Sequence, residues 1–280
     1  MLFSSRTPGR AYLPRVQLHF KSIGAGEPLV ILHGLFGTLD NWQTVGRAFA
    51  KTRRVLLVDQ RNHGKSPHRD THDYPGLAAD LAAWLDAEGL ECVDVLGHSM
   101  GGKTAMQFAL DYPDRVRRLV VVDMTPRAYP GGHEAILAAM ASVPVVGGTA
   151  VPAAGAADLT RADIEALLAR TIPEAGVRLF LMKNLRRERA GGYAWKLNLD
   201  ALTRDYPRVL EPVSGEPWAG PALFVRGERS GYVRDEDLPG IEALFPGARL
   251  VTIAGAGHWV HAEAPDALYE AVEGFLAEAN

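Results

Sequence analysis

The sequence predicts an α/β fold with a mostly parallel central sheet flanked by helices and an inserted, mainly helical cap. Short, uninterrupted runs of Val, Leu and Ile alternate with helical stretches, as is typical of strands covered on both faces. This alternation stops after residue 126 and resumes near residue 216. We therefore expect a core domain formed by residues 1–125 and 216–280, and a cap formed by residues 126–215.

The expected elements of the core follow in chain order. Strands are predicted to start at Val16, Pro28, Arg53, Glu91 and Val116. Helices are predicted between them over 40–51, 74–89 and 100–112. This alternation implies parallel βαβ units with right-handed crossovers. After the insertion we expect strands from Pro221 and Ala248, a helix over 238–245 and a final helix from Glu263.

The insertion is predicted to be helical because apolar residues recur at helical spacing in two stretches, 160–171 and 176–189. Residues 141–157 are rich in Ala, Val, Gly and Pro, which indicates a loosely packed connection. An insertion of roughly ninety residues is far longer than an ordinary loop, so we expect it to serve the function.

Composition excludes several classes of protein. The 30 basic and 33 acidic residues give a net charge of −3, too small for a nucleic-acid binder. The single cysteine, Cys92, cannot form an internal disulfide. We find no apolar run long enough for a signal peptide or a membrane span. We expect a cytoplasmic enzyme, monomeric or homodimeric, with a small-molecule substrate and neither nucleic-acid nor membrane partners.

The stretch GHSMG, residues 97–101, ends an apolar strand and opens a helix, the context of a nucleophile elbow. The two flanking glycines permit a sharp turn, so Ser99 is expected to project with its hydroxyl exposed. A serine hydroxyl is a poor nucleophile without a positioned base. His258 follows the last predicted strand and is the candidate base, because imidazole exchanges protons near neutral pH.

The same stretch also matches a phosphate-binding loop. Gly97 is followed after four residues by Gly102, Lys103 and Thr104, and the strand ending at Asp123 resembles one that delivers a carboxylate to magnesium. In an elbow, by contrast, Lys103 belongs to the first turns of a helix. A nucleotide-binding protein leaves the other motifs unexplained and is kept as a remote alternative.

The acid of a Ser-His-acid triad is the least obvious assignment. After the strand from Pro221, the usual carboxylate position is occupied by Ser230, and Glu228 and Asp235 lie in the wrong register. Asp123 ends the strand that follows the nucleophile helix, where a carboxylate could reach His258 from another direction. We therefore predict Asp123 as the acid and Ser230 as an auxiliary hydrogen-bonding residue.

The segment HGLFG, residues 33–37, follows a strand and is a candidate for half of an oxyanion hole. We expect the first donor to be the backbone amide of Leu35, with Phe36 as the alternative, and the second to be that of Met100. Such donors stabilise charge that appears only in the tetrahedral intermediate, and each contributes about 10²- to 10³-fold in rate.

For several other groups of residues, a purely structural role competes with a functional one. Trp195 and Trp259, with Trp42, are candidates to line an acyl pocket, although aromatic residues often belong to the core. The metal-like group His68, Asp70, His72 and Asp73 is more consistent with a solvated surface. A solvated helical face is likewise the better interpretation of the basic cap residues Arg178, Lys183, Arg186, Arg187 and Arg189. Asp59 and Arg61 are expected to brace a loop. We predict no metal or cofactor.

Six stretches together carry a family resemblance: HGLFGTLDNW, VDQRNHGKSPH, GHSMGGKTAM, VVVDMTP, NLRRERAGGYAWKLNL and GHWVHAEAP. They resemble the α/β-hydrolase superfamily, and within it the serine esterases of the YbfF and ABHD11-like subgroup. The resemblance covers essentially the whole chain. It implies an α/β-hydrolase fold, the acid at Asp123, and hydrolysis of carboxylic esters, or of thioesters, with short or medium acyl chains.

Three other classes of function remain as alternatives. The same fold can support an acyltransferase, an acyl-CoA thioesterase or a perhydrolase. The remote alternatives are the nucleotide-binding protein and a catalytically silent binding scaffold. The complete set of reactive residues argues against the scaffold.

Overall fold

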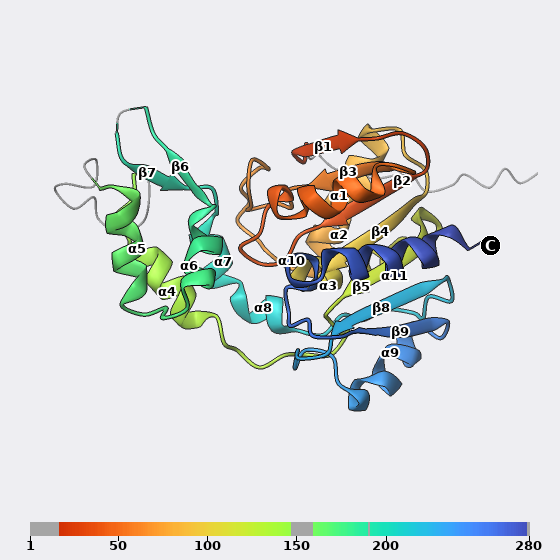
Figure 1. Cartoon of the computed structure of the whole chain (residues 1–280). Coiled ribbons are helices and arrows are strands. Elements are labelled where there is room, and N and C mark those ends of the chain that lie inside the picture. Colours follow the sequence, from red (N-terminus) through yellow and green to blue (C-terminus); the bar gives the residue numbers. More distant parts are fainter. Residues whose placement is uncertain (1–16, 147–158, 190, 279–280) are drawn as a thin grey trace, which may run out of the picture.

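The computed structural model describes residues 17–146, 159–189 and 191–278 (Figure 1). Its centre is a seven-stranded sheet with the order β1-β3-β2-β4-β5-β8-β9, in which only β1 is antiparallel to its neighbour. The strands are β1 (Phe20–Ile23), β2 (Pro28–Leu32), β3 (Arg54–Val58), β4 (Val93–His98), β5 (Val116–Val122), β8 (Ala222–Gly227) and β9 (Ala248–Ile253). The predicted α/β fold is confirmed.

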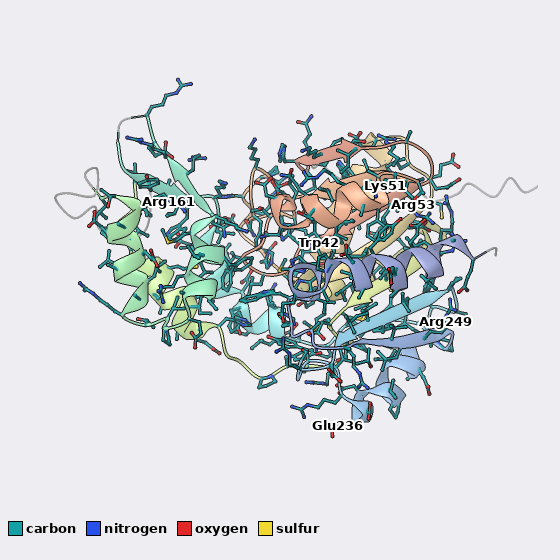
Figure 2. The ribbon with its side chains drawn as sticks, in the orientation of Figure 1. Trp42, Lys51, Arg53, Arg161, Glu236 and Arg249 are labelled. Carbon is teal, nitrogen blue, oxygen red and sulfur yellow. The ribbon has the colours of Figure 1, made fainter. Side chains whose placement is uncertain are left out.

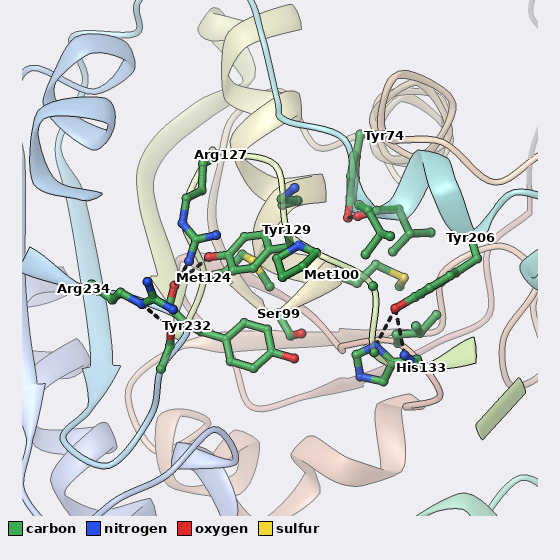
Figure 3. A pocket seen from close by; sticks show the side chains of 18 residues that line it. Tyr74, Ser99, Met100, Met124, Arg127, Tyr129, His133, Tyr206, Tyr232 and Arg234 are labelled. Atoms are coloured by element: carbon green, nitrogen blue, oxygen red, sulfur yellow. Dashed lines mark hydrogen bonds between the residues drawn. The ribbon is translucent and has the colours of Figure 1, made fainter. Parts of the chain in front are cut away.

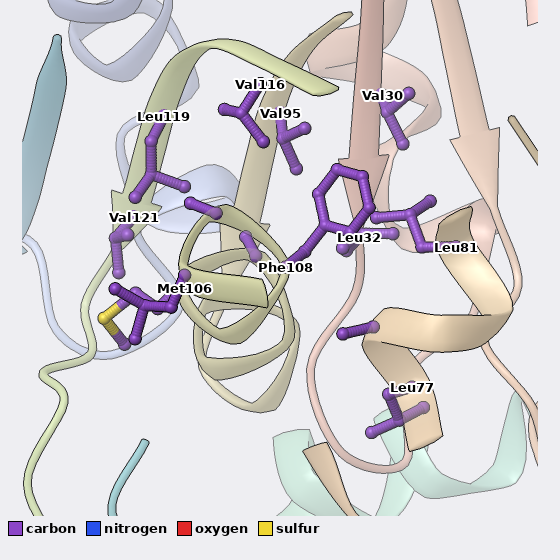
Figure 4. Close-up of a cluster of buried hydrophobic side chains, with 14 of the residues drawn as sticks. Val30, Leu32, Leu77, Leu81, Val95, Met106, Phe108, Val116, Leu119 and Val121 are labelled. Carbon is purple, nitrogen blue, oxygen red and sulfur yellow. The ribbon is translucent and has the colours of Figure 1, made fainter. Parts of the chain in front are cut away.

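Both faces of the central strands of this sheet are buried, which explains their uninterrupted apolar runs. Successive residues of a strand point to opposite faces. Val30 and Leu32 of β2 therefore pack into one hydrophobic cluster, and Leu29 and Ile31 pack into another. Figure 4 shows the first cluster, where Phe108 lies between the sheet and a neighbouring helix. Each such fully buried side chain contributes about 1.5–3 kcal/mol to folding.

Helices cover the two faces of the core. The first hydrophobic cluster takes side chains from α2, α3 and α9, and the second from α1, α10 and α11. Their bounds are α1 (Gln43–Phe49), α2 (Tyr74–Ala87), α3 (Met100–Asp111), α9 (Leu238–Leu244), α10 (Val260–Glu263) and α11 (Pro265–Ala277). A 3₁₀ turn at Leu39–Trp42 precedes α1, and it places Trp42 in the interior (Figure 2).

The segment between β5 and β8 has its own hydrophobic cluster and lies beside the core (Figure 1). Its elements are α4 (Glu134–Ser142), α5 (Arg161–Ala169), α6 (Ala175–Met182), β6 (Leu185–Arg187), β7 (Tyr193–Trp195), α7 (Leu199–Arg204) and α8 (Tyr206–Leu210). The segment is mainly helical, as expected. Its exact boundaries, 126 and 215, remain a prediction.

The structure differs from the sequence prediction at two places, and part of a third predicted segment lies outside the described residues. The strand expected from Val16 begins at Phe20 instead, and it pairs antiparallel with β3. The two-stranded hairpin β6–β7 was not predicted, because each strand has only three residues. Residues 147–157, which make up most of the stretch 141–157, lie outside the described part of the chain. Among the described helices, none is long and apolar enough to cross a membrane.

Candidate active site

Ser99 lies in a sharp turn between β4 and α3. Its backbone has φ 54° and ψ −122°, a conformation that non-glycine residues rarely adopt. Both neighbouring glycines are needed. A Cβ on Gly97 would lie 2.0 Å from the carbonyl oxygen of Gly101, and a Cβ on Gly101 would lie 2.5 Å from that of Leu32. The sequence thus allows β4, the turn and α3 to pack closely, and the turn presents the Ser99 side chain.

The phosphate-loop interpretation is wrong for this stretch. Residues 100–111 are helical, so no loop is available to curl around phosphates. Lys103 is buried in α3, where its ammonium donates to the carbonyl oxygen of Glu211 and lies 5.1 Å and 5.4 Å from the ring centres of Tyr129 and Tyr74.

The structure brings Ser99, His258 and Asp123 together from three separate segments. His258 Nε2 lies 3.1 Å from Ser99 Oγ, and its Nδ1 lies 2.7 Å from Asp123 Oδ2. With Nδ1–H donating to the carboxylate, Nε2 is free to accept from the serine hydroxyl. The three side chains therefore form a continuous hydrogen-bonded path.

Asp123 is fully buried at the end of β5 and has φ 51°. Its carboxylate is held by three donors. Oδ1 accepts from the backbone N–H of Gly227 at 3.1 Å, and Oδ2 accepts from the Ser230 hydroxyl as well as from His258. Ser230 therefore contacts the acid rather than the imidazole. A buried carboxylate needs such donors, because burying an unpaired charge is very costly.

The imidazole of His258 is enclosed by aromatic groups. The ring of Tyr232 stacks on it with centres 3.9 Å apart and planes 17° apart. His98 Nε2 donates to the carbonyl oxygen of His258 at 2.8 Å. Burial lowers the pKa of His98, and it lowers the pKa of His261 to about 4. Both neighbouring histidines are therefore neutral near pH 7, and Asp123 supplies the carboxyl group in contact with His258.

The loop 33–37 packs directly on the nucleophile turn. A Cβ on Gly34 would lie 3.1 Å from Ser99 Cβ. Phe36 has φ 61°, and its carbonyl oxygen accepts a 2.7 Å hydrogen bond from the side-chain amide of Asn184. Leu35 lies beside Ser99 in the lining of two cavities. The oxyanion roles of Leu35, Phe36 and Met100 remain predictions.

Two cavities meet at Ser99. The larger, of about 290 Å³, is lined by four tyrosines and three cationic side chains (Figure 3). The smaller, of about 170 Å³, is lined by apolar side chains and by five histidines, His33, His98, His133, His258 and His261. The polar residues of the larger cavity include Tyr74, Lys103, Arg127, Tyr129, Tyr206, Tyr232 and Arg234. The smaller cavity is lined by Phe36, Trp42, Ile136, Val177, Phe180, Leu181 and Trp259, among others.

Some predicted residues lie elsewhere. The position of Trp195 does not support a substrate-binding role, because its indole N–H donates to Met140 O at 3.1 Å and it lines a third cavity that does not include Ser99. The solvated-surface interpretation is wrong for His72, which is fully buried and lies 3.3 Å from Met100 Sδ. Asp59 does brace a loop, since its carboxylate accepts from the N–H of Leu39.

The sequence did not single out four residues of the site: His133, Tyr206 and Tyr232 line the larger cavity, and Asn184 contacts the loop 33–37. Tyr232 lies two residues after Ser230, and this spacing was the one available signal. The other three belong to the segment between β5 and β8, and they reach the site through its tertiary packing.

Residues 27–265 match the family described as the alpha/beta hydrolase fold. The chain belongs to this family. It is 43% identical over 254 residues to the mouse sn-1-specific diacylglycerol lipase ABHD11, covering 89% of this chain and 80% of the relative. It is 38% identical over 251 residues to esterase YbfF of Escherichia coli, covering 89% and 93%. A solved marine microorganism esterase is 40% identical with a TM-score of 0.87, covering 93% of this chain and 99% of the other.

These similarities confirm the resemblance seen in the motifs. The relatives carry the names esterase and lipase, and they support a serine ester hydrolase of the α/β-hydrolase family.

Proposed function

We propose that the chain is a serine carboxylesterase that hydrolyses short- to medium-chain carboxylic esters through an acyl-enzyme on Ser99. The observation that carries the proposal is the hydrogen-bonded path from Asp123 through His258 to Ser99 at the junction of two cavities. The apolar side chains of the smaller cavity suit an acyl chain, and the larger cavity, lined by four tyrosines and three cationic side chains, suits the alcohol part of the ester.

In the first half-reaction, Ser99 Oγ attacks the carbonyl carbon while His258 Nε2 takes the hydroxyl proton. The carbonyl oxygen becomes an oxyanion, which accepts hydrogen bonds from the backbone amides of Leu35 and Met100. When the C–O bond breaks, His258 returns the proton to the departing alcohol. Asp123 holds the imidazole in the correct tautomer and stabilises its cation.

In the second half-reaction, water takes the place of the alcohol. His258 removes a proton from this water, and the resulting hydroxide attacks the acyl carbon. Collapse of the second tetrahedral intermediate returns the proton to Ser99 Oγ and releases the carboxylic acid.

The first test removes the nucleophile. Ser99→Ala should abolish hydrolysis of p-nitrophenyl butyrate and labelling by a fluorophosphonate probe, while circular dichroism stays unchanged. Ser22→Ala, an exposed serine on β1, is the matched control and should keep both. A Ser99→Ala protein that still turns over the ester would refute the proposal.

The second test addresses the acid. Asp123→Asn should lower kcat by about 10³- to 10⁴-fold, because the amide favours the wrong imidazole tautomer. KM should change much less. If Asp123→Asn keeps near-native kcat, the acid lies elsewhere.

Substrate range follows from an acyl series. We expect kcat/KM to peak among short and medium p-nitrophenyl esters and to be lower for acyl-CoA thioesters. Product analysis with a competing alcohol separates hydrolysis from acyl transfer. A cytoplasmic location and a monomeric or homodimeric state remain predictions, the latter checked by light scattering.

A further inference from the structure

Three residues line both cavities: Leu35, Ser99 and His133. The proposed function uses the first two and leaves His133 without a role. His133 immediately precedes α4, in the segment that leaves β5 for the cap. Its side chain therefore lies where an ester bound to Ser99 would divide between the two cavities.

Tyr206 fixes which nitrogen of His133 carries the proton. The Tyr206 hydroxyl oxygen accepts from the His133 backbone N–H at 3.0 Å, and the hydroxyl lies 2.9 Å from His133 Nδ1. Tyr206 is only 4% exposed, and its hydroxyl is hydrogen-bonded to no other acceptor in the described part of the chain. Among the described residues, Nδ1 is the acceptor within hydrogen-bond distance of the Tyr206 hydroxyl, and a hydrogen bond donated to it leaves the His133 proton on Nε2.

The Nε2–H donor of His133 belongs to a neutral imidazole whose orientation is fixed by its neighbours. Burial and the nearby His258 lower the pKa of His133, so its imidazole is uncharged near pH 7. The rings of Tyr206 and Phe36 approach it edge-on, at centre distances of 5.9 Å and 6.0 Å. Figure 3 shows the side of the imidazole opposite Tyr206 facing into the cavity, toward Ser99 and Tyr232. Nε2 has no hydrogen-bond partner among the residues that the structure describes.

We propose that His133 Nε2–H donates a hydrogen bond to an oxygen in the alcohol part of the substrate, and so selects esters of oxygen-bearing alcohols over esters of plain alkyl alcohols. The inference rests on the proposed function. The alcohol part is assigned to the larger cavity because four tyrosines and three cationic side chains line it. Since His133 donates, an ether oxygen serves as well as a hydroxyl.

A net hydrogen bond is worth about 1 kcal/mol, which corresponds to a preference of roughly fivefold to tenfold. The test compares kcat/KM for two matched pairs: 2-hydroxyethyl butyrate against propyl butyrate, and 2-methoxyethyl butyrate against butyl butyrate. Each value is divided by the rate of alkaline hydrolysis of the same ester, which removes intrinsic differences between leaving groups. We expect the oxygen-bearing member of both pairs to be preferred.

His133→Phe keeps a ring of similar shape and removes the donor, and it should bring both ratios close to one. His133→Gln restores a side-chain N–H and should recover part of the preference. Tyr206→Phe removes the hydroxyl that fixes the tautomer, and it should give intermediate ratios. His68→Phe, at an exposed histidine that does not line either cavity at Ser99, is the control and should leave the ratios unchanged.

Three results would overturn the inference: ratios of one in the native protein, native ratios in a folded His133→Phe variant, or a preference for oxygen only in the acyl part. The last is measured with methyl 4-methoxybutanoate against methyl hexanoate. Failure of the proposed function is distinguishable, because Ser99→Ala would then keep activity on all of these esters whatever the ratios.

Discussion

The stacking of Tyr232 on His258 is the feature at the residue scale that most affects the chemistry. A parallel ring 3.9 Å away fixes the orientation of the imidazole, and its electron-rich face attracts the cation that forms when His258 takes the serine proton. The backbone of Tyr232 is itself held, because its N–H donates to Ser230 Oγ and its carbonyl accepts from the Tyr129 hydroxyl.

Tyr232→Leu should therefore lower kcat by roughly tenfold, the effect of losing about 1–1.5 kcal/mol of cation–π stabilisation in the transition state. Tyr232→Phe keeps the ring and should keep most of kcat. Steady-state kinetics on one p-nitrophenyl ester measures both variants. Equal kcat values for the Leu and Phe variants would show that stacking does not assist His258.

Ser99, His258 and Asp123 could be singled out from the sequence because each lies in a local pattern at the end of a strand. A glycine-flanked serine, a glycine-rich histidine loop and a strand-terminal aspartate are visible without tertiary information. His133 and Tyr206 are not, because their placement depends on how the cap packs against the core. The substrate-binding role of Trp195 stays a prediction, and its indole N–H donates to Met140 O within the segment between β5 and β8.

At the element scale, the cap is joined to the loop 33–37 by Asn184, between α6 and β6. Asn184 is 1% exposed, and its amide donates to Phe36 O at 2.7 Å and to Leu181 O at 3.2 Å. Phe36 is in a positive-φ conformation that costs of order 1–3 kcal/mol unless its surroundings enforce it. The cap thus helps to hold the loop that carries the predicted oxyanion donor Leu35.

Asn184→Asp keeps the shape of the side chain and removes the donor. We expect kcat to fall by about 10- to 100-fold with a smaller change in KM, because a displaced oxyanion donor weakens only the transition state. Affinity for a boronic acid that mimics the tetrahedral intermediate should fall in parallel. Arg161→Gln, an exposed cap residue (Figure 2), is the control and should leave both quantities unchanged. Native boronate affinity in Asn184→Asp would contradict the coupling.

Strands can be predicted from the sequence where burial on both faces requires a continuous run of apolar residues. β2, β4 and β5 are covered on both faces, so their apolar runs were visible in the sequence. β1 lies at the sheet edge with two exposed residues, and its start was placed too early. The hairpin β6–β7 is defined by its pairing and not by a hydrophobic run, so the sequence contains little signal for it.

At the scale of the whole molecule, Lys103 is a buried lysine at the boundary between core and cap. Its ammonium donates to Glu211 O in the chain segment that returns from the cap, and two tyrosine rings flank it. Burial, with a contribution from Arg127, lowers the pKa of Lys103 to about 7. The unfolded chain therefore binds this proton more tightly than the folded one between about pH 7 and the ordinary lysine pKa.

The free energy of unfolding of the native protein should consequently rise with pH above 7, relative to Lys103→Met. Each pH unit in this window contributes up to about 1.4 kcal/mol, so the difference between the two proteins should shift by on the order of 2 kcal/mol from pH 7.5 to 9.5. Urea unfolding at both pH values measures it. Lys51→Met, at an exposed lysine after α1, should show no such shift. A pH-independent difference for Lys103→Met would mean that Lys103 stays charged when folded.

Because Asp123 precedes the cap in the sequence, two of the three residues of the predicted triad lie before the cap and one lies after it. Ser99, Asp123 and the predicted oxyanion donors Leu35 and Met100 precede the segment 126–215, whereas His258, Ser230 and Tyr232 follow it. A polypeptide cut within that segment would yield one fragment bearing an inert alcohol and another bearing an imidazole with nothing to activate. The rate of ester hydrolysis would then measure the reassociation of the two fragments.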